Sequence, residues 1–267
     1  MNDNPSLPIA MSFAGTDPSG GAGLQADIET LASMGVHCAP VVTAVTAQDT
    51  SKLLRYEAMG APLLVEQARA ILEDMPVAAI KIGMIGSVQN AEAIHSILID
   101  YPNLPVVLDP LISAGGGGEL ASEELLDVMA SLLFPLTTVL TPNSNEARAF
   151  APEADTLDAC AMELLEMGSD YVLITGSHEA TPNVVNSLYN GHRIIETYTW
   201  ERLPGNYHGS GCTLAAAISA LLAQGMEPVT AIHEAQEYTW ETLKHGYRPG
   251  MGQMIPDRFF WAHGDDD

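Results

Sequence analysis

Basic residues are scarce in this chain. Its 267 residues include 10 lysines and arginines against 34 aspartates and glutamates, a formal net charge of -24 at pH 7. Such a surface repels the phosphates of nucleic acids and anionic lipid headgroups, so we expect neither nucleic acid nor a membrane as a partner. Any polyphosphate ligand would have to be neutralised by helix N-termini and by a divalent metal ion rather than by lysines and arginines.

Cysteines and long apolar runs are also missing. Cys38, Cys160 and Cys212 are widely separated and form no CxxC pair, which argues against a disulfide framework and a zinc site and favours a reducing cytoplasm. No run approaches the ~18 apolar residues of a membrane-spanning helix. Residues 1–5 show no basic region leading into an apolar core, so we expect no secretory signal.

What the chain does have is a 47% hydrophobic content and a regular alternation of short apolar runs with helical segments. This alternation predicts an α/β fold, a three-layer αβα sandwich with a mostly parallel central sheet. Asn190-Gly191 between two further apolar runs favours a two-residue hairpin turn. We expect strands at 9–14, 41–47, 78–82, 106–108, 138–140, 171–175, 184–189 and 193–198. We expect helices at 24–34 and 63–72, one that ends at 99, one at 122–133, a short one opened by residues 141–146, and three more at 157–167, 214–223 and 229–243.

Neither an internal repeat nor a linker interrupts this pattern. We therefore expect one domain over residues 1–267, with residues 264–267 as a flexible acidic tail.

Two familiar nucleotide-binding motifs are absent: the chain has no GxxxxGK[ST] sequence and no GxGxxG opening its first helix. Residues 208–213 instead read His-Gly-Ser-Gly-Cys-Thr and run into an apolar helix. A helix start with glycines offers N–H groups and partial positive charge to a phosphate, and Cys212 there should ionise more readily than a free thiol. The alternative is a tight loop capped by Ser210, with Cys212 as a small core residue.

Polar residues follow several predicted strands, and parallel strands bring their carboxyl ends to one edge of a sheet. Asp109, Asn143 and Glu146 carry oxygen atoms suited to Mg²⁺, directly or through water. The alternatives are an N-cap for Asn143 and a first-turn helix acid for Glu146. His178 and His208 lie on candidate site loops and are candidate ligands.

Four stretches carry a resemblance to a known family. They are residues 14–27 (AGTDPSGGAGLQAD), 43–48 (TAVTAQ), 81–84 (KIGM) and 208–213 (HGSGCT), in this order along the chain. Together they resemble the hydroxymethylpyrimidine/phosphomethylpyrimidine kinases of thiamine biosynthesis, in the ribokinase-like superfamily. The resemblance implies ATP-dependent phosphorylation of 4-amino-5-hydroxymethyl-2-methylpyrimidine and then of its monophosphate, with Mg²⁺ as the metal.

The resemblance also implies roles for individual residues. The N–H groups of residues 209–212 would form an anion hole for the transferring phosphoryl group, and Cys212, as a thiolate, would accept the hydroxyl proton. Asp109 and Glu146 would govern Mg²⁺. The implied substrate-binding residues are Gly15, Ala22, Asp27, Gln48 and Met84; the catalytic ones are Gly209, Ser210, Gly211 and Cys212; the ATP-binding ones are Gly115, Gly116, Gly117, Asn143, Thr175, Gly176 and His178.

Two departures from the family pattern concern lysines. Many members carry one shortly after the Asp-Pro that matches Asp109-Pro110, and another in a Lys-Gly-Gly-His stretch that here reads Thr-Gly-Ser-His over 175–178. We expect the glycine run at 115–118 and the metal to replace these cations over ATP.

Three functions remain open at this point. The first is the two-step pyrimidine kinase, the second is a pyridoxal or pyridoxine kinase, and the third is a non-catalytic pyrimidine sensor. The retained glycine loop, Cys212 and Glu146 favour catalysis. For the kinase we expect small-molecule partners only, a homodimer and a cytoplasmic location.

Overall fold

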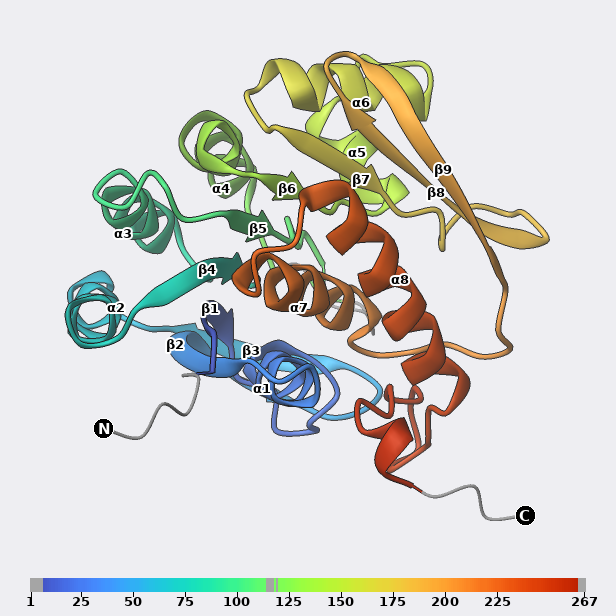
Figure 1. The fold of residues 1–267 in the computed structure, drawn as a ribbon, viewed down its shortest axis with the longest axis horizontal. Helices are drawn as coiled ribbons and strands as arrows, with labels where there is room; N and C mark the ends of the chain where they lie inside the picture. Colours follow the sequence, from blue (N-terminus) through green and yellow to red (C-terminus); the bar gives the residue numbers. More distant parts are fainter. Residues whose placement is uncertain (1–6, 114–117, 119, 264–267) are drawn as a thin grey trace.

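The computed structural model describes residues 7–113, 118 and 120–263. Its centre is a nine-stranded sheet in the order β3-β2-β1-β4-β5-β6-β7-β8-β9 (Figure 1). The six strands from β2 to β7 in this order run parallel, and β3, β8 and β9 run antiparallel to their neighbours. The strands are β1 (Ile9–Gly15), β2 (His37–Gln48), β3 (Leu53–Ala58), β4 (Val77–Ile82), β5 (Val106–Leu108), β6 (Val139–Leu140), β7 (Tyr171–Ile174), β8 (Asn183–Asn190) and β9 (Arg193–Glu201).

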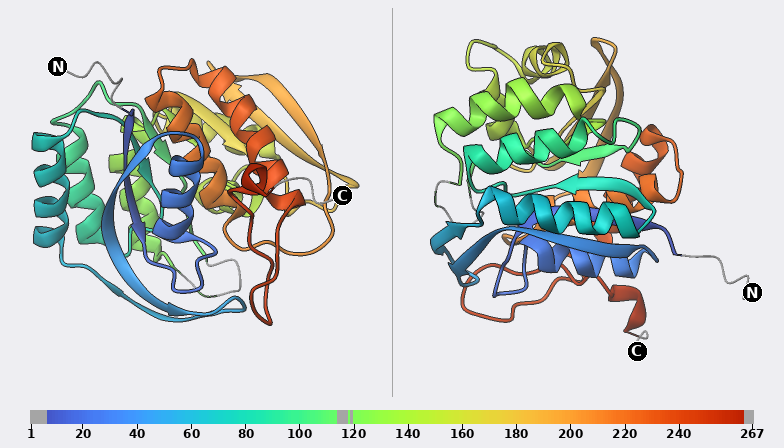
Figure 2. Two further views of the ribbon diagram at one scale, coloured as in Figure 1. Left: turned by 60° about the horizontal axis from the view of Figure 1, so that its bottom comes forward. Right: turned by 90° about the vertical axis from the view of Figure 1, so that its left-hand side faces the viewer.

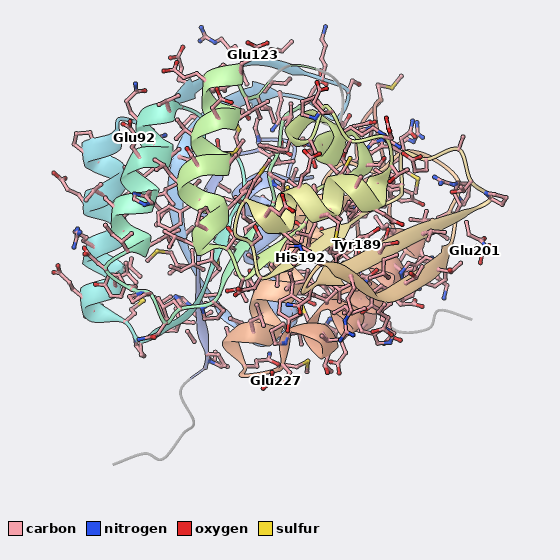
Figure 3. The ribbon with its side chains drawn as sticks, turned by 90° about the horizontal axis from the view of Figure 1, so that it is seen from above. Glu92, Glu123, Tyr189, His192, Glu201 and Glu227 are labelled. Carbon is pink, nitrogen blue, oxygen red and sulfur yellow. The ribbon has the colours of Figure 1, made fainter. Side chains whose placement is uncertain are left out.

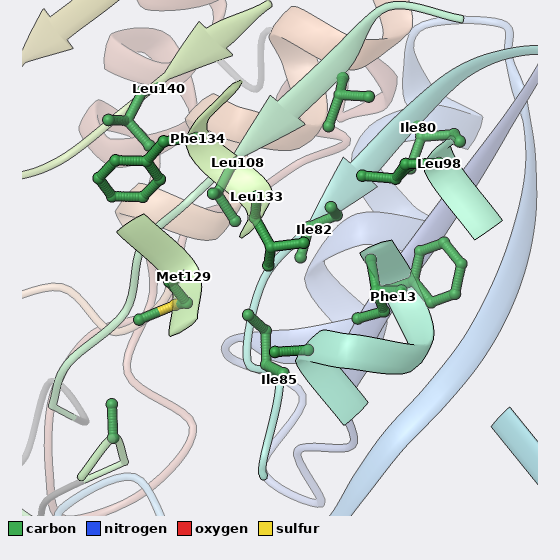
Figure 4. Packing of buried hydrophobic residues seen from close by; sticks show 14 of the residues in the cluster. Phe13, Ile80, Ile82, Ile85, Leu98, Leu108, Met129, Leu133, Phe134 and Leu140 are labelled. Atoms are coloured by element: carbon green, nitrogen blue, oxygen red, sulfur yellow. The ribbon is translucent and has the colours of Figure 1, made fainter. Parts of the chain in front are cut away.

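Helices cover both faces of the sheet, which confirms the predicted three-layer sandwich (Figure 2). One face carries α2 (Ala61–Asp74), α3 (Val88–Leu98), α4 (Glu123–Val128), α5 (Ser144–Phe150) and α6 (Leu157–Glu166). The other carries α1 (Gly23–Ser33), α7 (Ser210–Ala223) and α8 (Pro228–Lys244). Each face has its own apolar cluster, and Figure 4 shows part of the first around Phe13, Ile82 and Leu133. Burying both faces removes apolar surface from water and holds the strand ends in place.

Two elements differ in type from the sequence-based expectation, and β2 begins at His37 rather than at residue 41. β3 was not predicted, because its side chains are mostly exposed and the usual alternation of apolar and polar residues is weak on this edge strand. The helix expected at 122–133 is α-helical only to Val128 and continues as a π-turn over Met129–Leu133 and a 3-10 turn over Phe134–Leu136. Pro135 has no backbone N–H and cannot continue a regular helix. The predicted hairpin is confirmed, with Gly191 at φ 56°.

Most of the acidic residues lie on the outside of the molecule, whereas Asp17, Asp27, Asp109 and Glu146 are buried. Figure 3 shows Glu92, Glu123 and Glu227 at its periphery, and all three are exposed. In the part of the chain that the structure describes, no helix is long and apolar enough to cross a bilayer. The acidic tail expected at 264–267 lies outside the described residues.

Candidate active site

A cavity of about 770 Å³ opens at the carboxyl ends of the parallel strands. Its lining joins the loop after β1, the ends of β2, β4 and β5, the start of α5 and the start of α7. The predicted site residues that line it are Gly15, Ala22, Gln48, Met84, Asp109, Asn143, Glu146, Thr175, His178, Gly209, Ser210, Gly211 and Cys212. Residues nearly 200 positions apart in the sequence therefore meet at one rim, as the strand-end argument predicts.

Asp27 is not among the lining residues. It lies on the inward face of α1, has 0% exposure, and receives a 2.6 Å hydrogen bond from Ser12 Oγ. Both its carboxylate oxygens lie 3.0 Å from Lys81 Nζ. The expected contact of Asp27 with the pyrimidine is therefore corrected: this buried carboxylate pairs with the ammonium of Lys81.

Gly176 is also turned away from the cavity. Its N–H donates a 3.0 Å hydrogen bond to Asn186 Oδ1, and a Cβ there would overlap the Val185 carbonyl. The glycine is thus needed for the close approach of β7 and β8, and the expected ATP contact through it is corrected. The predicted ATP residues Gly115, Gly116 and Gly117 lie outside the described residues.

Lys81 is a site residue for which the sequence predicted no role of its own, although it belongs to the motif at residues 81–84. Its side chain has 0% exposure, yet it contributes to the cavity wall between Asp27, Cys212 and Asp109. A lysine inside a buried apolar strand was the signal that could have revealed it, because an ammonium is buried only with a partner. The site therefore holds a buried cation even though the two family lysines are absent.

The predicted anion-binding turn is confirmed as a helix start. Gly209 is the N-cap of α7 with φ 90°, and Ser210, not Gly209, is the first helical residue, without a side-chain cap. The alternative of a cap by Ser210 is therefore wrong. A helix leaves its first N–H groups without intrahelical partners, and Ser210, Gly211 and Cys212, which contribute them here, line the cavity. A side chain at position 209 would overlap the Gly21 carbonyl, so only glycine fits.

The expectation that Cys212 ionises easily is wrong for the protein without ligands. The thiol has 6% exposure, and burial raises its pKa to about 12. The nearby carboxylates of Asp109 and Asp27 also raise this pKa, whereas Lys81 and the N–H of Gly23 lower it. Because burial outweighs the effects of Lys81 and of the Gly23 N–H, the thiol is protonated at neutral pH.

Asp109 and Glu146 form a carboxylate pair at the cavity wall. Asp109 follows β5 with 3% exposure, and its Oδ2 has no hydrogen-bond partner within the described residues. Glu146 and Asn143 form a capping box at α5, with Asn143 N donating to Glu146 Oε2 over 2.9 Å and Glu146 N donating to Asn143 Oδ1 over 3.0 Å. The two helix-cap readings are thus confirmed. Burial raises the pKa of both carboxyl groups, and the charge of Asp109 raises that of Glu146 further.

A divalent cation suits this pair. The donors are oxygen atoms, one of them buried in the described part of the chain without a partner, and a positive ion would relieve the repulsion by Asp109 that raises the pKa of Glu146. Among the described residues, no group of three or more His, Cys, Asp and Glu is arranged around one point. Mg²⁺ is commonly held by one or two carboxylates together with phosphates and water, so two protein ligands are sufficient.

His208 does not act as a free ligand in this structure. Its Nε2 lies 2.8 Å from Asp17 Oδ2, and both side chains are buried. Asp17 also accepts hydrogen bonds from the N–H groups of Ser19 and Ala22. Burial favours a higher pKa for Asp17, but the hydrogen bonds from His208 and Ser19 outweigh it and lower the pKa. The pair fastens the glycine-rich loop after β1 to the start of α7.

Comparison with known proteins gives consistent results. Residues 17–257 match the sequence model of a family described as phosphomethylpyrimidine kinase. A protein of Synechococcus elongatus named hydroxymethylpyrimidine/phosphomethylpyrimidine kinase is 35% identical over 259 residues, which is 95% of this chain and 98% of that protein.

Solved structures of two kinds of kinase share this fold. The phosphomethylpyrimidine kinase of Clostridium difficile is 30% identical, with a TM-score of 0.76 over 88% of this chain and 99% of that one. The ADP complex of Bacillus subtilis pyridoxal kinase is 29% identical, with a TM-score of 0.89 over 97% of this chain and 100% of that one.

Proposed function

The chain belongs to the phosphomethylpyrimidine kinase family, and from that membership we propose that it phosphorylates 4-amino-5-hydroxymethyl-2-methylpyrimidine and then its monophosphate, using ATP. It is a phosphotransferase of thiamine biosynthesis with the ribokinase-like fold. One observation carries the assignment of the site: the family's separate motifs after β1, at the end of β2, after β4 and at the start of α7 line a single cavity. The kinase relatives, which match nearly the whole chain, favour this enzyme over a non-catalytic sensor.

The pyrimidine binds in the part of the cavity between β1, β2 and β4 in this proposal. Gln48 offers both a donor and an acceptor to the amino and nitrogen edge of the ring. Met84 and Gly15 pack together there, and a Cβ on Gly15 would lie 2.9 Å from Met84 Sδ. Glycine at position 15 thereby lets the Met84 thioether approach the end of β1, where it forms an apolar wall for the ring. Ala22 closes this region from the glycine-rich loop.

Phosphoryl transfer falls to the start of α7. The N–H groups of Ser210, Gly211 and Cys212 bind the transferring group where negative charge develops. Mg²⁺, which Asp109 and Glu146 would hold, supplies neutralisation of the phosphate charge when bound. The neighbouring Asn143, Thr175 and His178 extend the cavity on the ATP side.

In this proposal Cys212 accepts the proton of the substrate hydroxyl, but only when Mg²⁺, ATP and the pyrimidine are bound. The carboxylate of Asp109 is one of the groups that raise the thiol pKa. When a bound cation balances the charge of Asp109, Lys81 lowers the pKa of the thiol with less opposition from that carboxylate. The thiolate then forms more readily. The cysteine thus gains its basicity from the ligands.

An ADP-release assay tests the function directly. We expect ADP with the hydroxymethylpyrimidine and, in a separate reaction, with its monophosphate. Pyridoxal is the third compound to assay, because the structure of Bacillus subtilis pyridoxal kinase matches 97% of this chain with a TM-score of 0.89. A higher kcat/KM for pyridoxal than for the pyrimidine would assign the second kinase activity instead, and ADP release with neither would refute both. The proposed homodimer and cytoplasmic location are tested by light scattering and cell fractionation.

Gln48→Ala is expected to lower kcat/KM for the pyrimidine by about 10- to 100-fold, mostly through KM, because the ring edge loses its paired donor and acceptor. The side chain of Gln48 makes no hydrogen bond to the part of the chain that is described, so the substitution leaves little else unpaired. Steady-state kinetics measure the effect. Gln89→Ala, on the exposed side of α3, is the matched control. An unchanged KM in Gln48→Ala would remove this residue from the substrate site.

Mg²⁺ is expected to raise the melting temperature more at pH 8 than at pH 6. Burial raises the pKa of Glu146 from 4.5 to about 8, so the folded protein binds more protons than the unfolded chain in this range. The stability that this group contributes is therefore lost as the pH rises from about 4.5 to 8. Metal binding favours the ionised carboxylate and therefore restores the lost stability at pH 8.

Thermal melts with and without Mg²⁺ at the two pH values measure this effect. Glu146→Gln should abolish most of the difference, whereas Glu123→Gln, an exposed first-turn acid of α4, should preserve it. Equal shifts at both pH values in the unmodified protein would argue against a metal at Glu146.

A further inference from the structure

Arg258 is a buried arginine in the irregular segment after α8. It has 1% exposure and is among the largest fully buried side chains of the described residues. It lies one position beyond the stretch that matches the family model, which ends at residue 257. An arginine is rarely buried without partners, so its contacts indicate what it holds.

The guanidinium of Arg258 joins three parts of the chain. Nη2 donates to the Gly21 carbonyl over 2.5 Å, and Nη1 donates to the Gly20 carbonyl over 3.3 Å. Nε donates to Thr213 Oγ1 over 3.1 Å, and Nη1 also pairs with Glu29 Oε2 at 2.9 Å. All three nitrogens of the planar guanidinium thus donate hydrogen bonds. A lysine ammonium on its flexible side chain does not reproduce this geometry.

These partners belong to the two loops on which the proposed reaction depends. Gly20 and Gly21 lie in the loop between β1 and α1, and Gly15 and Ala22 at its two ends line the substrate part of the cavity. Thr213 lies in the first turn of α7 and donates its own hydroxyl to the Gly209 carbonyl over 2.8 Å. The two loops also touch directly, since there is no room for a side chain between Gly209 and the Gly21 carbonyl.

We infer that Arg258 is a positioning residue, which fixes the substrate loop at Gly20–Gly21 on the phosphoryl-transfer turn at the start of α7. The inference rests on the proposed function. A hydroxymethyl group held by one loop and a phosphoryl group held by the other have to meet at bonding distance, and a shift of about 1 Å between them costs about 100-fold in rate. The Asp17–His208 pair links the same two loops at a second point.

The segment that carries Arg258 is itself anchored to α8. Tyr238 donates its hydroxyl to the Arg258 carbonyl over 2.8 Å, and Asp257 N donates to the Thr242 carbonyl over 2.9 Å. Earlier in the same segment, the Met254 carbonyl accepts a hydrogen bond from His208 N, and Gln253 N donates to the Thr50 carbonyl at the β2–β3 turn. The guanidinium is therefore held on a backbone with fixed neighbours, as a positioning role requires.

Kinetics of Arg258→Met and Arg258→Lys test the inference. We expect kcat to fall about 100-fold in Arg258→Met, with KM for the pyrimidine changed less than about threefold, and Arg258→Lys to recover only part of the loss. Hydrogen exchange supplies a readout of position: the amides of residues 17–23 should exchange faster in both variants, while those of α3 stay as in the unmodified protein. Arg69→Met, which removes an exposed ion pair with Asp100 on the opposite layer, is the control and should change neither.

Glu29→Gln separates the ion pair of Arg258 from its hydrogen bonds to Gly20, Gly21 and Thr213, which together form the clamp between the two loops. It removes the charge partner of Arg258 but leaves the acceptors at Gly20, Gly21 and Thr213, so we expect kcat within about threefold of the unmodified enzyme. A loss in Glu29→Gln as large as in Arg258→Met would overturn the inference, and so would unchanged kcat and exchange in a folded Arg258→Met. If Arg258→Met does not fold, Arg258→Lys decides by the same two measurements. An inactive unmodified protein would refute the proposed function, while the exchange of residues 17–23 would still test the clamp.

Discussion

Cys212→Ser is expected to lower kcat about 1000-fold while the protein stays folded and still binds the pyrimidine. A serine hydroxyl fills nearly the same space at the start of α7 but is a far weaker acid than a thiol, so it cannot carry the negative charge of a proton acceptor at neutral pH. Loss of a general base costs about 10²- to 10⁴-fold. Because the side chain is buried, no surface contact is lost, and KM should change little.

The pH dependence distinguishes a base from a packing residue. With the pKa of the thiol raised to about 12 in the ligand-free protein, a scan of thiolate absorbance should show no ionisation of Cys212 below pH 9. In the presence of Mg²⁺, ATP analogue and pyrimidine, the ionisation should move to lower pH. The difference between the unmodified protein and Cys212→Ser isolates this cysteine from the other two.

Cys160→Ser is the matched control. Cys160 is buried in α6 on the opposite face of the sheet, so the same chemical change there should leave turnover near normal. Turnover of Cys212→Ser within about tenfold of the unmodified enzyme would remove Cys212 as the base and leave the proton to another acceptor.

The parts of the site that sequence could predict are those fixed by local rules. A buried strand followed by polar or glycine residues places Gly15, Gln48 and Asp109 at one rim whatever the details of packing, because parallel strands share a direction. The start of α7 follows in the same way from glycines in front of an apolar run. Asn143 and Glu146 were predictable as a cap for a similar reason, since their spacing is that of a capping box.

Tertiary contacts decided the rest. Asp27 has the helical position of either a core or a surface residue, and its burial is explained by the ammonium of Lys81 on β4 and the hydroxyl of Ser12 on β1. Arg258 stands in an irregular segment more than 40 residues from Thr213 and more than 200 from Gly21, so no local pattern marks it. The pKa of Cys212 depends mainly on burial by elements distant in the sequence, which the residues around Cys212 do not reveal.

Asp109→Asn is expected to lower turnover by at least about 1000-fold without lowering stability. The amide has the shape of the carboxylate but no charge, so it cannot hold Mg²⁺ opposite the phosphates, whose neutralisation contributes several kcal/mol to phosphoryl transfer. Burial raises the pKa of Asp109 because it disfavours the ionised form. Above its usual pKa of 3.8 the native carboxylate therefore lowers folding stability, and that penalty grows as the pH rises toward its raised pKa.

The same substitution should change Cys212. Asp109 is one of the charges that raise the thiol pKa, so the neutral amide should let Cys212 ionise at lower pH in the protein without ligands, even though the enzyme is inactive. Turnover, melting temperature at pH 8 and thiolate absorbance measure the three effects, with Asp127→Asn on the exposed side of α4 as the control. Loss of activity with a lower melting temperature and an unshifted thiol would mean that Asp109 supports the fold rather than the reaction. Loss of activity together with an easier ionisation of Cys212 would instead place metal ligand and base in one electrostatic unit, in which the cation that neutralises Asp109 also prepares the thiol.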